Sequence, residues 1–431
     1  MSIYEYQQSF GAADKTSPAM RRAVEEWFRL YYGKAAPGED SCQRIAYTVV
    51  SKLVKAVFSE YRATAEDPLL QRAVAALEEV KKEAVQLALV GGECYIKPCP
   101  EKAGFSFTLI PRDRVLIFGR DARGVPVDVG TAEKSVLGQH YYTLLERRRM
   151  DGEGFLTIQN RLFRSYDPDQ LGKPVALGEH PMYRQLRESY TYEIPVGSVG
   201  LVRVKTPMLN CVDGSADGVS VYAAAAGLIR SIDCNEFQLN GEFRRGESRI
   251  IASKDLLGPE GLTEHLFVGL DDDPEAVGIT VFSPQLREQS FLARKQEYLR
   301  NVESVIGLKR GLLSEVNAEQ RTATEVSSSQ GEHNLTVMDF QQMWELALQD
   351  TARLCLVLGK LYGLGIGEDD RVSVDWGNGV LYDEEKLWQD YMAMVAAGLL
   401  MPEVALGWRF NLPAETEEQR RIIRERFMPE G

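Results

Sequence analysis

The acidic runs Asp271-Asp272-Asp273 and Asp369-Asp370 are the first places where this sequence could do chemistry, because neighbouring carboxylates can hold a divalent cation. Adjacent residues in an extended turn point apart, however, so we expect no shared ion at either run. The four histidines have no i,i+4 pair and the six cysteines no C-x-x-C pair, which leaves zinc poorly supported. Phosphate-loop and nucleophile-elbow motifs are absent. We therefore expect no catalysis, no cofactor and no metal.

A polar stretch at residues 320–326, Gln-Arg-Thr-Ala-Thr-Glu-Val, is more informative than any of these candidates. It lies between two segments whose apolar spacing predicts long helices, 285–308 and 333–361. Long connections of this kind in a compact protein tend to be functional. Small hydroxyls, acids and one arginine suit a loop that moves or lines a passage. The alternative is a plain surface connector.

Composition and charge limit the possible partners. The chain has 431 residues, 44% of them hydrophobic, which is typical of a folded protein of two or three domains. Its net charge of −13 disfavours binding to DNA or to a membrane through a broad basic surface. The scattered cysteines fit free thiols in a reducing cytosol. Without a signal peptide or an apolar run near 20 residues, we expect a soluble intracellular protein.

The elements that must position these residues follow an α+β pattern. The predicted N-terminal helices are 17–32, 40–59 and 67–90. Gly33 and the Gly91-Gly92 pair are the expected helix ends. From 93 to 202 the chain alternates as strands do, with strands at 140–146 and 154–164 joined by a charged turn at 147–151.

Two further helices, 220–239 and 285–308, enclose a small insert. Asn240-Gly241 is the expected end of the first, and the apolar stripe of the second is Leu292, Leu299, Val302 and Ile306. The insert is predicted to contain strands at 249–252 and 279–282 and a short helix near 261–268. The remaining predicted elements are a helix at 333–361, a strand at 371–376, and helices at 383–398, 402–405 and 415–427.

Three short pieces stand out by their order and spacing. They are Asp217-Gly218-Val219-Ser220 at the start of a long helix, the turn at 240–246, and Thr322-Ala323-Thr324-Glu325-Val326 before the longest helix. Together they resemble the portal proteins of tailed bacteriophages, the head-to-tail connectors of the siphophage and prophage type. The resemblance extends over nearly the whole chain, from about Trp27 onward.

The resemblance implies a portal architecture with an α/β wing, a two-helix stem, a small α/β clip, a tunnel loop, a long tunnel helix and a short helical crown. The implied boundaries are 1–216 for the wing, 217–240 and 285–307 for the stem helices, 241–284 for the clip, 308–332 for the tunnel loop, 333–382 for the long helix with the rest of the wing, and 383–431 for the crown. This crown is shorter than that of larger family members.

The resemblance also implies three groups of site residues. The DNA-facing residues of the tunnel loop are Lys309, Arg310, Asn317, Gln320, Arg321, Thr324 and Glu325. The mixed charge of this loop predicts weak, reversible contact with DNA, which suits translocation.

In the stem, Arg287, Arg294, Glu297 and Arg300 could form ion pairs between subunits. Glu297 is also spaced i,i+3 from both Arg294 and Arg300. The alternative is an ordinary solvated helix face.

The clip residues are Arg244, Arg245 and Arg249 on a positive side and Asp271, Asp272 and Asp273 on a negative side. Such charges would speed and orient docking of partners. An ordinary charged surface is the alternative.

As a function, the resemblance implies a structural ring of twelve subunits at one capsid vertex, active in capsid assembly, DNA packaging and genome ejection. The implied partners are double-stranded DNA, contacted weakly and without sequence preference, the terminase large subunit, a head-completion adaptor, scaffold and major capsid protein. We expect no membrane partner. The implied location is the virion, with assembly in the host cytoplasm. The alternatives are another head–tail ring component and, less favoured, a cytosolic enzyme.

Overall fold

The computed structural model describes residues 3–33, 42–102, 104–245, 249–253, 267–270, 280–282, 286–315, 323–365, 367, 369–377, 384–410 and 412–428. The fold class is α+β, as predicted. The chain divides into two compact units. The first is Met1–Val57 with Thr64–Ser373, and the second is Phe58–Ala63 with Val374–Gly431.

Local signals at helix ends explain the N-terminal helices. These are α1 (Ile3–Phe10), α2 (Pro18–Tyr32), α3 (Ile45–Val57) and α4 (Pro68–Gly91). The side chain of Ser17 accepts the N–H of Met20, and Gly33 ends α2 with a φ of 67°. Asp67 caps α4 by accepting the N–H groups of Leu69 and Leu70 at 2.9 and 2.8 Å. Helix α3 is shorter than the predicted 40–59.

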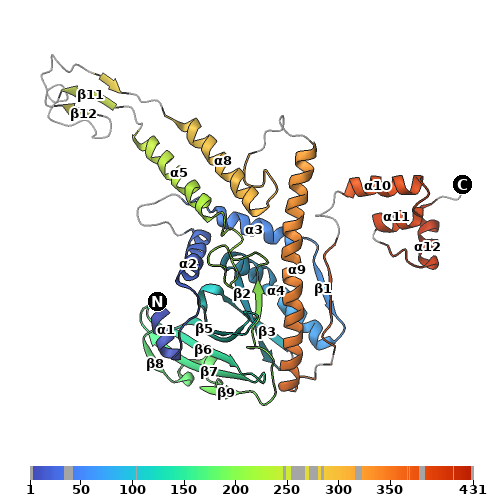
Figure 1. Cartoon of the computed structure of the whole chain (residues 1–431), viewed down its shortest axis with the longest axis horizontal. Coiled ribbons are helices and arrows are strands. Elements are labelled where there is room, and N and C mark those ends of the chain that lie inside the picture. The colour runs from blue at the N-terminus through green and yellow to red at the C-terminus, as the bar shows by residue number, and fades with distance from the viewer. Residues whose placement is uncertain are drawn as a thin grey trace. The chain divides into compact units, whose positions relative to one another are not determined.

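Two antiparallel sheets build the body of the first unit (Figure 1). The smaller sheet has the order β10-β2-β3, formed by Val202–Lys205, Glu93–Glu101 and Gly104–Pro111. The larger has the order β4-β5-β6-β7-β8, formed by Val115–Arg120, Pro126–Leu137, His140–Met150, Leu156–Ser165 and Lys173–Val175. Strand β9 (Ser189–Thr191) pairs with β7. Three short 3-10 helices complete this body: η1 (Arg112–Arg114), η2 (Leu177–Glu179) and η3 (Pro181–Tyr183).

The predicted charged turn at 147–151 is wrong. Residues up to Met150 belong to β6, where Arg148 pairs in register with Ile158 of β7. Arg148 is buried, and its guanidinium donates a hydrogen bond to Glu146. Its charge was therefore a misleading sign of an exposed turn. The turn follows instead, where Asp151 Oδ1 accepts the N–H groups of Glu153 and Phe155.

Helices α5 (Ala226–Arg245) and α8 (Glu288–Ile306) lie side by side (Figure 1). Asn235 Nδ2 donates to the carbonyl of Phe291 at 3.1 Å, and Lys295 Nζ lies 2.9 Å from Glu236 Oε2. Two predictions fail for α5. It starts at Ala226 rather than 220, and it continues through Asn240-Gly241, because packing against α8 outweighs the weak local propensity of glycine.

The apolar faces of this helix pair also differ from the prediction. Leu299, Val302 and Ile306 are buried as expected. Leu292, which was expected on the same stripe, is 44% exposed, and Phe237 of α5 is 42% exposed.

The insert between α5 and α8 contains three short strands. Strand β11 (Arg249–Ser253) pairs in parallel with β12 (Phe267–Leu270) and antiparallel with β13 (Thr280–Phe282). The first and last confirm predicted strands. The predicted helix near 261–268 is wrong for Phe267 and Val268, which belong to β12, and its other residues lie outside the described ones.

Helix α9 (Ala323–Leu361) has 39 residues and begins well before the predicted residue 333. Its first turns contain residues 323–326, the last four of the polar run assigned above to a loop, and the first three lie outside the described residues. Serine and threonine have modest helix propensity, but adding turns to an existing helix costs little. Farther along, Val337, Phe340 and Trp344 are buried, and α9 packs against α3, α4, β2 and β10 (Figure 1).

The second unit contains α10 (Glu384–Ala396), α11 (Pro402–Arg409) and α12 (Glu417–Phe427). Arg424 Nε donates to Glu403 Oε1 at 2.6 Å, which ties α12 to α11. Strands β1 (Arg62–Ala65) and β14 (Val372–Asp375) form a separate two-stranded sheet. Among the helices of the described residues, none is sufficiently long and apolar to cross a membrane.

We predict that Asp67→Ala will destabilise the first unit by about 1–2 kcal/mol, because it removes a helix cap. The same carboxylate also accepts the N–H of Gly367 at 2.9 Å. Urea unfolding measures the effect. Glu66→Ala is the matched control, since its side chain is 86% exposed and should change stability by less than about 0.5 kcal/mol. Equal effects of the two substitutions would contradict the capping role.

Candidate functional site

The acidic runs considered for metal binding do not form a cation site among the described residues. No group of three or more histidine, cysteine, aspartate or glutamate side chains is placed to hold a metal there. Asp369 is held by Arg371, whose Nη2 lies 2.6 Å from Asp369 Oδ2. These hydrogen bonds lower the pKa of Asp369 to about 2. The run Asp271-Asp272-Asp273 lies outside the described residues.

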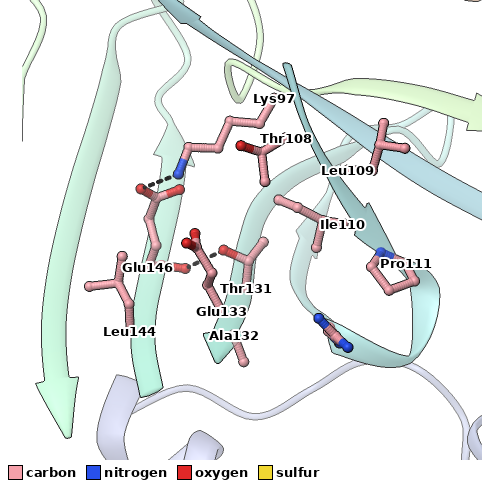
Figure 2. Close-up of a pocket in the computed structure, with 11 residues that line it drawn as sticks. Lys97, Thr108, Leu109, Ile110, Pro111, Thr131, Ala132, Glu133, Leu144 and Glu146 are labelled. Atoms are coloured by element: carbon pink, nitrogen blue, oxygen red, sulfur yellow. Dashed lines mark hydrogen bonds and ion pairs between the residues drawn. The ribbon is translucent and has the colours of Figure 1, made fainter. Parts of the chain in front are cut away.

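A small hollow of about 30 Å³ between β3, β5 and β6 brings Glu133 and Glu146 into one lining. Figure 2 shows Lys97 reaching Glu146, with 3.1 Å between Nζ and Oε2. Arg148 Nε donates to the other carboxylate oxygen at 2.6 Å. Burial raises the pKa of Glu146, but the charges of Arg148 and Lys97 prevail and bring it to about 2. Glu146 is thus a fixed anion in ion pairs, poorly suited to proton transfer at neutral pH.

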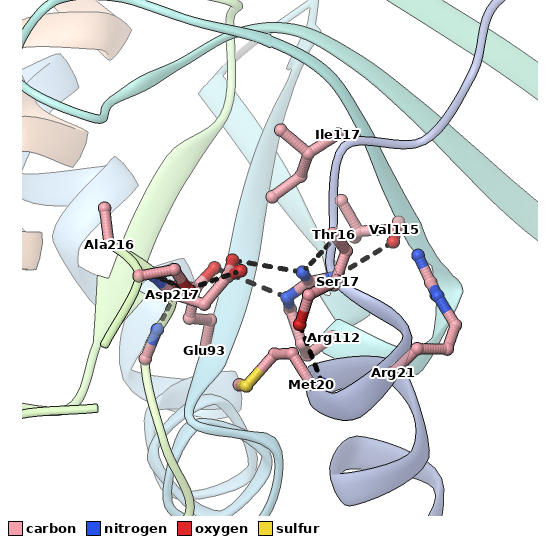
Figure 3. Close-up of polar contacts among 12 residues, drawn as sticks. Thr16, Ser17, Met20, Arg21, Glu93, Arg112, Val115, Ile117, Ala216 and Asp217 are labelled. Atoms are coloured by element: carbon pink, nitrogen blue, oxygen red, sulfur yellow. Dashed lines mark hydrogen bonds and ion pairs between the residues drawn. The ribbon is translucent and has the colours of Figure 1, made fainter. Parts of the chain in front are cut away.

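The best-defined polar cluster is a buried ionic network around Arg112, whose side chain is 1% exposed (Figure 3). Arg112 Nη2 donates to Thr16 Oγ1 at 2.9 Å and to Asp217 Oδ1 at 3.1 Å, and Nη1 donates to the carbonyl of Val115 at 2.9 Å. Glu93 Oε2 lies 3.7 Å from Arg112 Nε. The network joins the segment before α2, η1, β2 and the chain leading to α5.

Glu93 is the central anion of this network. Its carboxylate pairs with Arg203, and it accepts the N–H of Gly218 at 2.6 Å and the hydroxyl of Tyr95 at 2.8 Å. Burial raises the pKa of Glu93, but the charges of Arg203 and Arg112 outweigh it and lower the pKa to about 2. Glu93 therefore stays ionised in the interior.

Two glycines allow the backbones to cross beside this network. A Cβ on Gly92 would lie 2.3 Å from the carbonyl carbon of Gly218, and a Cβ on Gly218 would lie 2.2 Å from the oxygen of Gly92. Gly92 also ends α4 with a φ of 81°. The Asp217-Gly218 piece singled out in the sequence therefore has a packing role: it fixes where the chain crosses α4 before entering α5.

The predicted stem residues pair within the chain. Arg287 forms two hydrogen bonds to Glu242, at 2.9 and 2.6 Å. Arg294 Nε donates to Tyr298 Oη at 2.9 Å instead of pairing with Glu297. The other i,i+3 pair is present, with Arg300 Nη1 3.8 Å from Glu297 Oε2.

The predicted tunnel and clip residues are only partly within the described structure. Lys309 is half-buried and Arg310 is exposed, next to each other after α8. Thr324 and Glu325 belong to the first turns of α9 rather than to a loop. Arg244 and Arg245 end α5, and Arg249 begins β11. The predicted site residues outside the described ones are Asn317, Gln320, Arg321, Asp271, Asp272 and Asp273.

Glu303 is the residue that sequence reasoning missed. It is not among the predicted site residues, yet its side chain is 1% exposed and accepts hydrogen bonds from the segment after α8. A signal was available, because Glu303 follows Leu299 by four residues and precedes Ile306 by three. It thus lies on the apolar stripe of α8.

The organised polar groups of the described residues join structural elements to one another, and a family comparison identifies the class of the protein. The family described as Phage portal protein, SPP1 Gp6-like, matches residues 204–428, just over half of the chain, and the chain belongs to this family. The match includes α5, α8, α9 and the three helices of the second unit. It confirms the resemblance seen in the sequence. No curated protein matches the chain.

We predict that Glu93→Gln will destabilise the protein by about 3–5 kcal/mol at pH 7, because it removes the buried carboxylate that pairs with both Arg112 and Arg203. The pKa of Glu93 is lowered on folding, so its contribution is complete above the unfolded value of about 4.3 and is lost as the pH falls toward about 2. Urea unfolding should show the difference between wild type and variant shrinking over that range.

Glu297→Gln is the control for this experiment, since Glu297 is 63% exposed. A Glu93→Gln effect no larger than that of the control, or one independent of pH, would be evidence against the network's role.

Proposed function

We propose that this portal protein forms a ring of twelve subunits at one capsid vertex, and that the ring is the channel for DNA packaging and ejection. The observation that carries the proposal is the family match over residues 204–428. The side-by-side helices α5 and α8, followed by the 39-residue α9, are consistent with a stem and a tunnel helix.

The described elements refine the proposed regions. The stem is α5 with α8, the clip is the insert between them that contains β11, β12 and β13, and the tunnel segment joins α8 to α9. The wing comprises the sheets and helices before residue 217 with the later part of α9, and the crown is formed by α10, α11 and α12.

An acidic ring suits a channel that must not hold DNA. The chain carries a net charge of −13, so a subunit as a whole repels the phosphate backbone. Lys309 and Arg310 supply the local positive charge of the tunnel segment, with Arg321 as a further cation in the sequence. A few cations per subunit give weak contact without sequence preference, since phosphate contacts carry no sequence information.

The proposed partners take different parts of the ring. The terminase large subunit docks at the clip during packaging and a head-completion adaptor replaces it afterwards. Arg244, Arg245 and Arg249 provide positive charge for this docking, and Asp271–Asp273 provide negative charge. Scaffold and major capsid protein surround the ring in the head. Because the sequence has no phosphate-binding loop, ATP hydrolysis comes from the terminase. The protein assembles in the host cytoplasm and stays in the virion.

The first test is the oligomeric state. We expect mass photometry to find particles about twelve times the 48.3 kDa mass of the chain, and negative-stain images to show rings with an open axis. Assembly is followed with and without scaffold and capsid protein, over several salt concentrations. Particles that remain near 48.3 kDa in all of these conditions would argue against a portal ring.

The second test concerns the tunnel cations. The double substitution Lys309→Gln/Arg310→Gln should weaken the binding of duplex DNA by rings. The slope of log affinity against log salt should become shallower by about 0.9 for each phosphate that the ring no longer neutralises. The matched control is Lys173→Gln/Arg123→Gln, one exposed lysine of β8 and one exposed arginine of the turn between β4 and β5. If both pairs change the slope equally, the tunnel cations have no special role.

A further inference from the structure

We propose that Glu303 is a positioning residue that anchors residues 307–315 to α8, so that Lys309 and Arg310 keep a fixed place on the stem. This inference rests on the proposed function for its consequence for DNA, but not for its geometry. It assigns the start of the tunnel segment to the rigid scaffold, where the resemblance implied a tunnel loop.

The carboxylate of Glu303 collects hydrogen bonds from the residues that follow α8. Its Oε1 accepts the backbone N–H groups of Gly311 at 3.1 Å, Leu313 at 2.5 Å and Ser314 at 2.9 Å. Its Oε2 accepts the hydroxyl of Ser314 at 2.7 Å. One side chain in the last turn of α8 therefore satisfies three backbone donors and one side-chain donor.

Further bonds tie the same segment to three helices. Gln296 of α8 accepts the N–H of Glu315 at 2.8 Å, and Lys52 of α3 donates to the carbonyl of Leu312 at 2.6 Å. Thr336 of α9 donates to the carbonyl of Gly307 at 3.1 Å. Leu308 is buried at 3% exposure, so the segment is held at its first residues as well as its last.

The two sides of this contact depend on each other. The Glu303 carboxylate is 1% exposed, and a buried charge requires partners. Ser314 is buried, and its N–H belongs to no helix or strand, so this N–H also requires an acceptor. Movement of the segment away from α8 would break the four hydrogen bonds to Glu303 and remove the partners of its carboxylate.

The position of the cations follows from these constraints. Lys309 follows Leu308, which is buried, and Arg310 precedes Gly311, whose N–H donates to Glu303. Their backbone is therefore fixed relative to α8. DNA passing through the channel would therefore meet them as fixed points.

Hydrogen exchange on the full-length protein tests the anchor. In Glu303→Ala, exchange at the amides of residues 311, 313 and 314 should speed up at least tenfold, while α8 peptides before residue 300 keep wild-type rates. Glu303→Gln should have a smaller effect, because its amide oxygen still accepts. Glu297→Gln, an exposed glutamate on the same helix, should have no effect. Wild-type exchange in Glu303→Ala would overturn the proposal.

A variant that loses protection throughout the chain would point to general instability, and Ser314→Ala then decides the question. It removes only the hydroxyl bond to Oε2 and should speed exchange at 311–314 alone. Unchanged exchange there in Ser314→Ala, together with global loss in Glu303→Ala, would count against a local anchor.

DNA binding by rings tests the consequence. Glu303→Ala rings should show the weakened, flatter salt dependence of the Lys309→Gln/Arg310→Gln rings, although both cations are still present. Wild-type salt dependence in these rings would refute the positioning of the cations. Failure of the wild-type chain to form rings would contradict the proposed function, whereas the exchange experiment would still report on the anchor by itself.

Discussion

The structure of the first unit depends on a few charges that cannot be separated once they are buried. Arg112, Glu93 and Asp217 come from η1, β2 and the chain that leads to α5, and each is at most 2% exposed. Removing one of them leaves the others charged in a medium that solvates them poorly. The positions of η1, β2 and the start of α5 are therefore coupled. The helix pair proposed as the stem is attached to the sheets through this network.

Much of the fold could be predicted because its signals are local. Helix caps at Ser17, Gly33 and Asp67 lie within a few residues of the groups they satisfy, and period-two alternation marks most of the strands. The failures are non-local. Helix α5 continues through Asn240-Gly241 beside α8, and β6 extends through Arg147 because β7 pairs with it. Neither partner can be recognised from the residues beside the predicted break.

The candidate site was less predictable than the fold for a related reason. Sequence alone counts charges but does not show which of them are already neutralised inside the chain. Lys97 and Arg148 are committed to Glu146, and Arg203 to Glu93. Lys309 and Arg310 could be chosen only from their position after the second stem helix. The importance of Glu303 depends on backbone donors eight to eleven residues away, and no propensity or motif records such a contact.

The crossing of Gly92 and Gly218 limits how this sequence can diverge. In most packed positions a larger residue on one side can be offset by a smaller one on the other. Here each added Cβ would collide with main-chain atoms, and no substitution of a side chain removes those atoms. Neither glycine can therefore compensate for a substitution of the other. Both should be retained when the surrounding sequence diverges. A pair of glycines about 126 positions apart, one ending a helix and one following an aspartate, is thus a criterion for aligning distant relatives whose other residues no longer match.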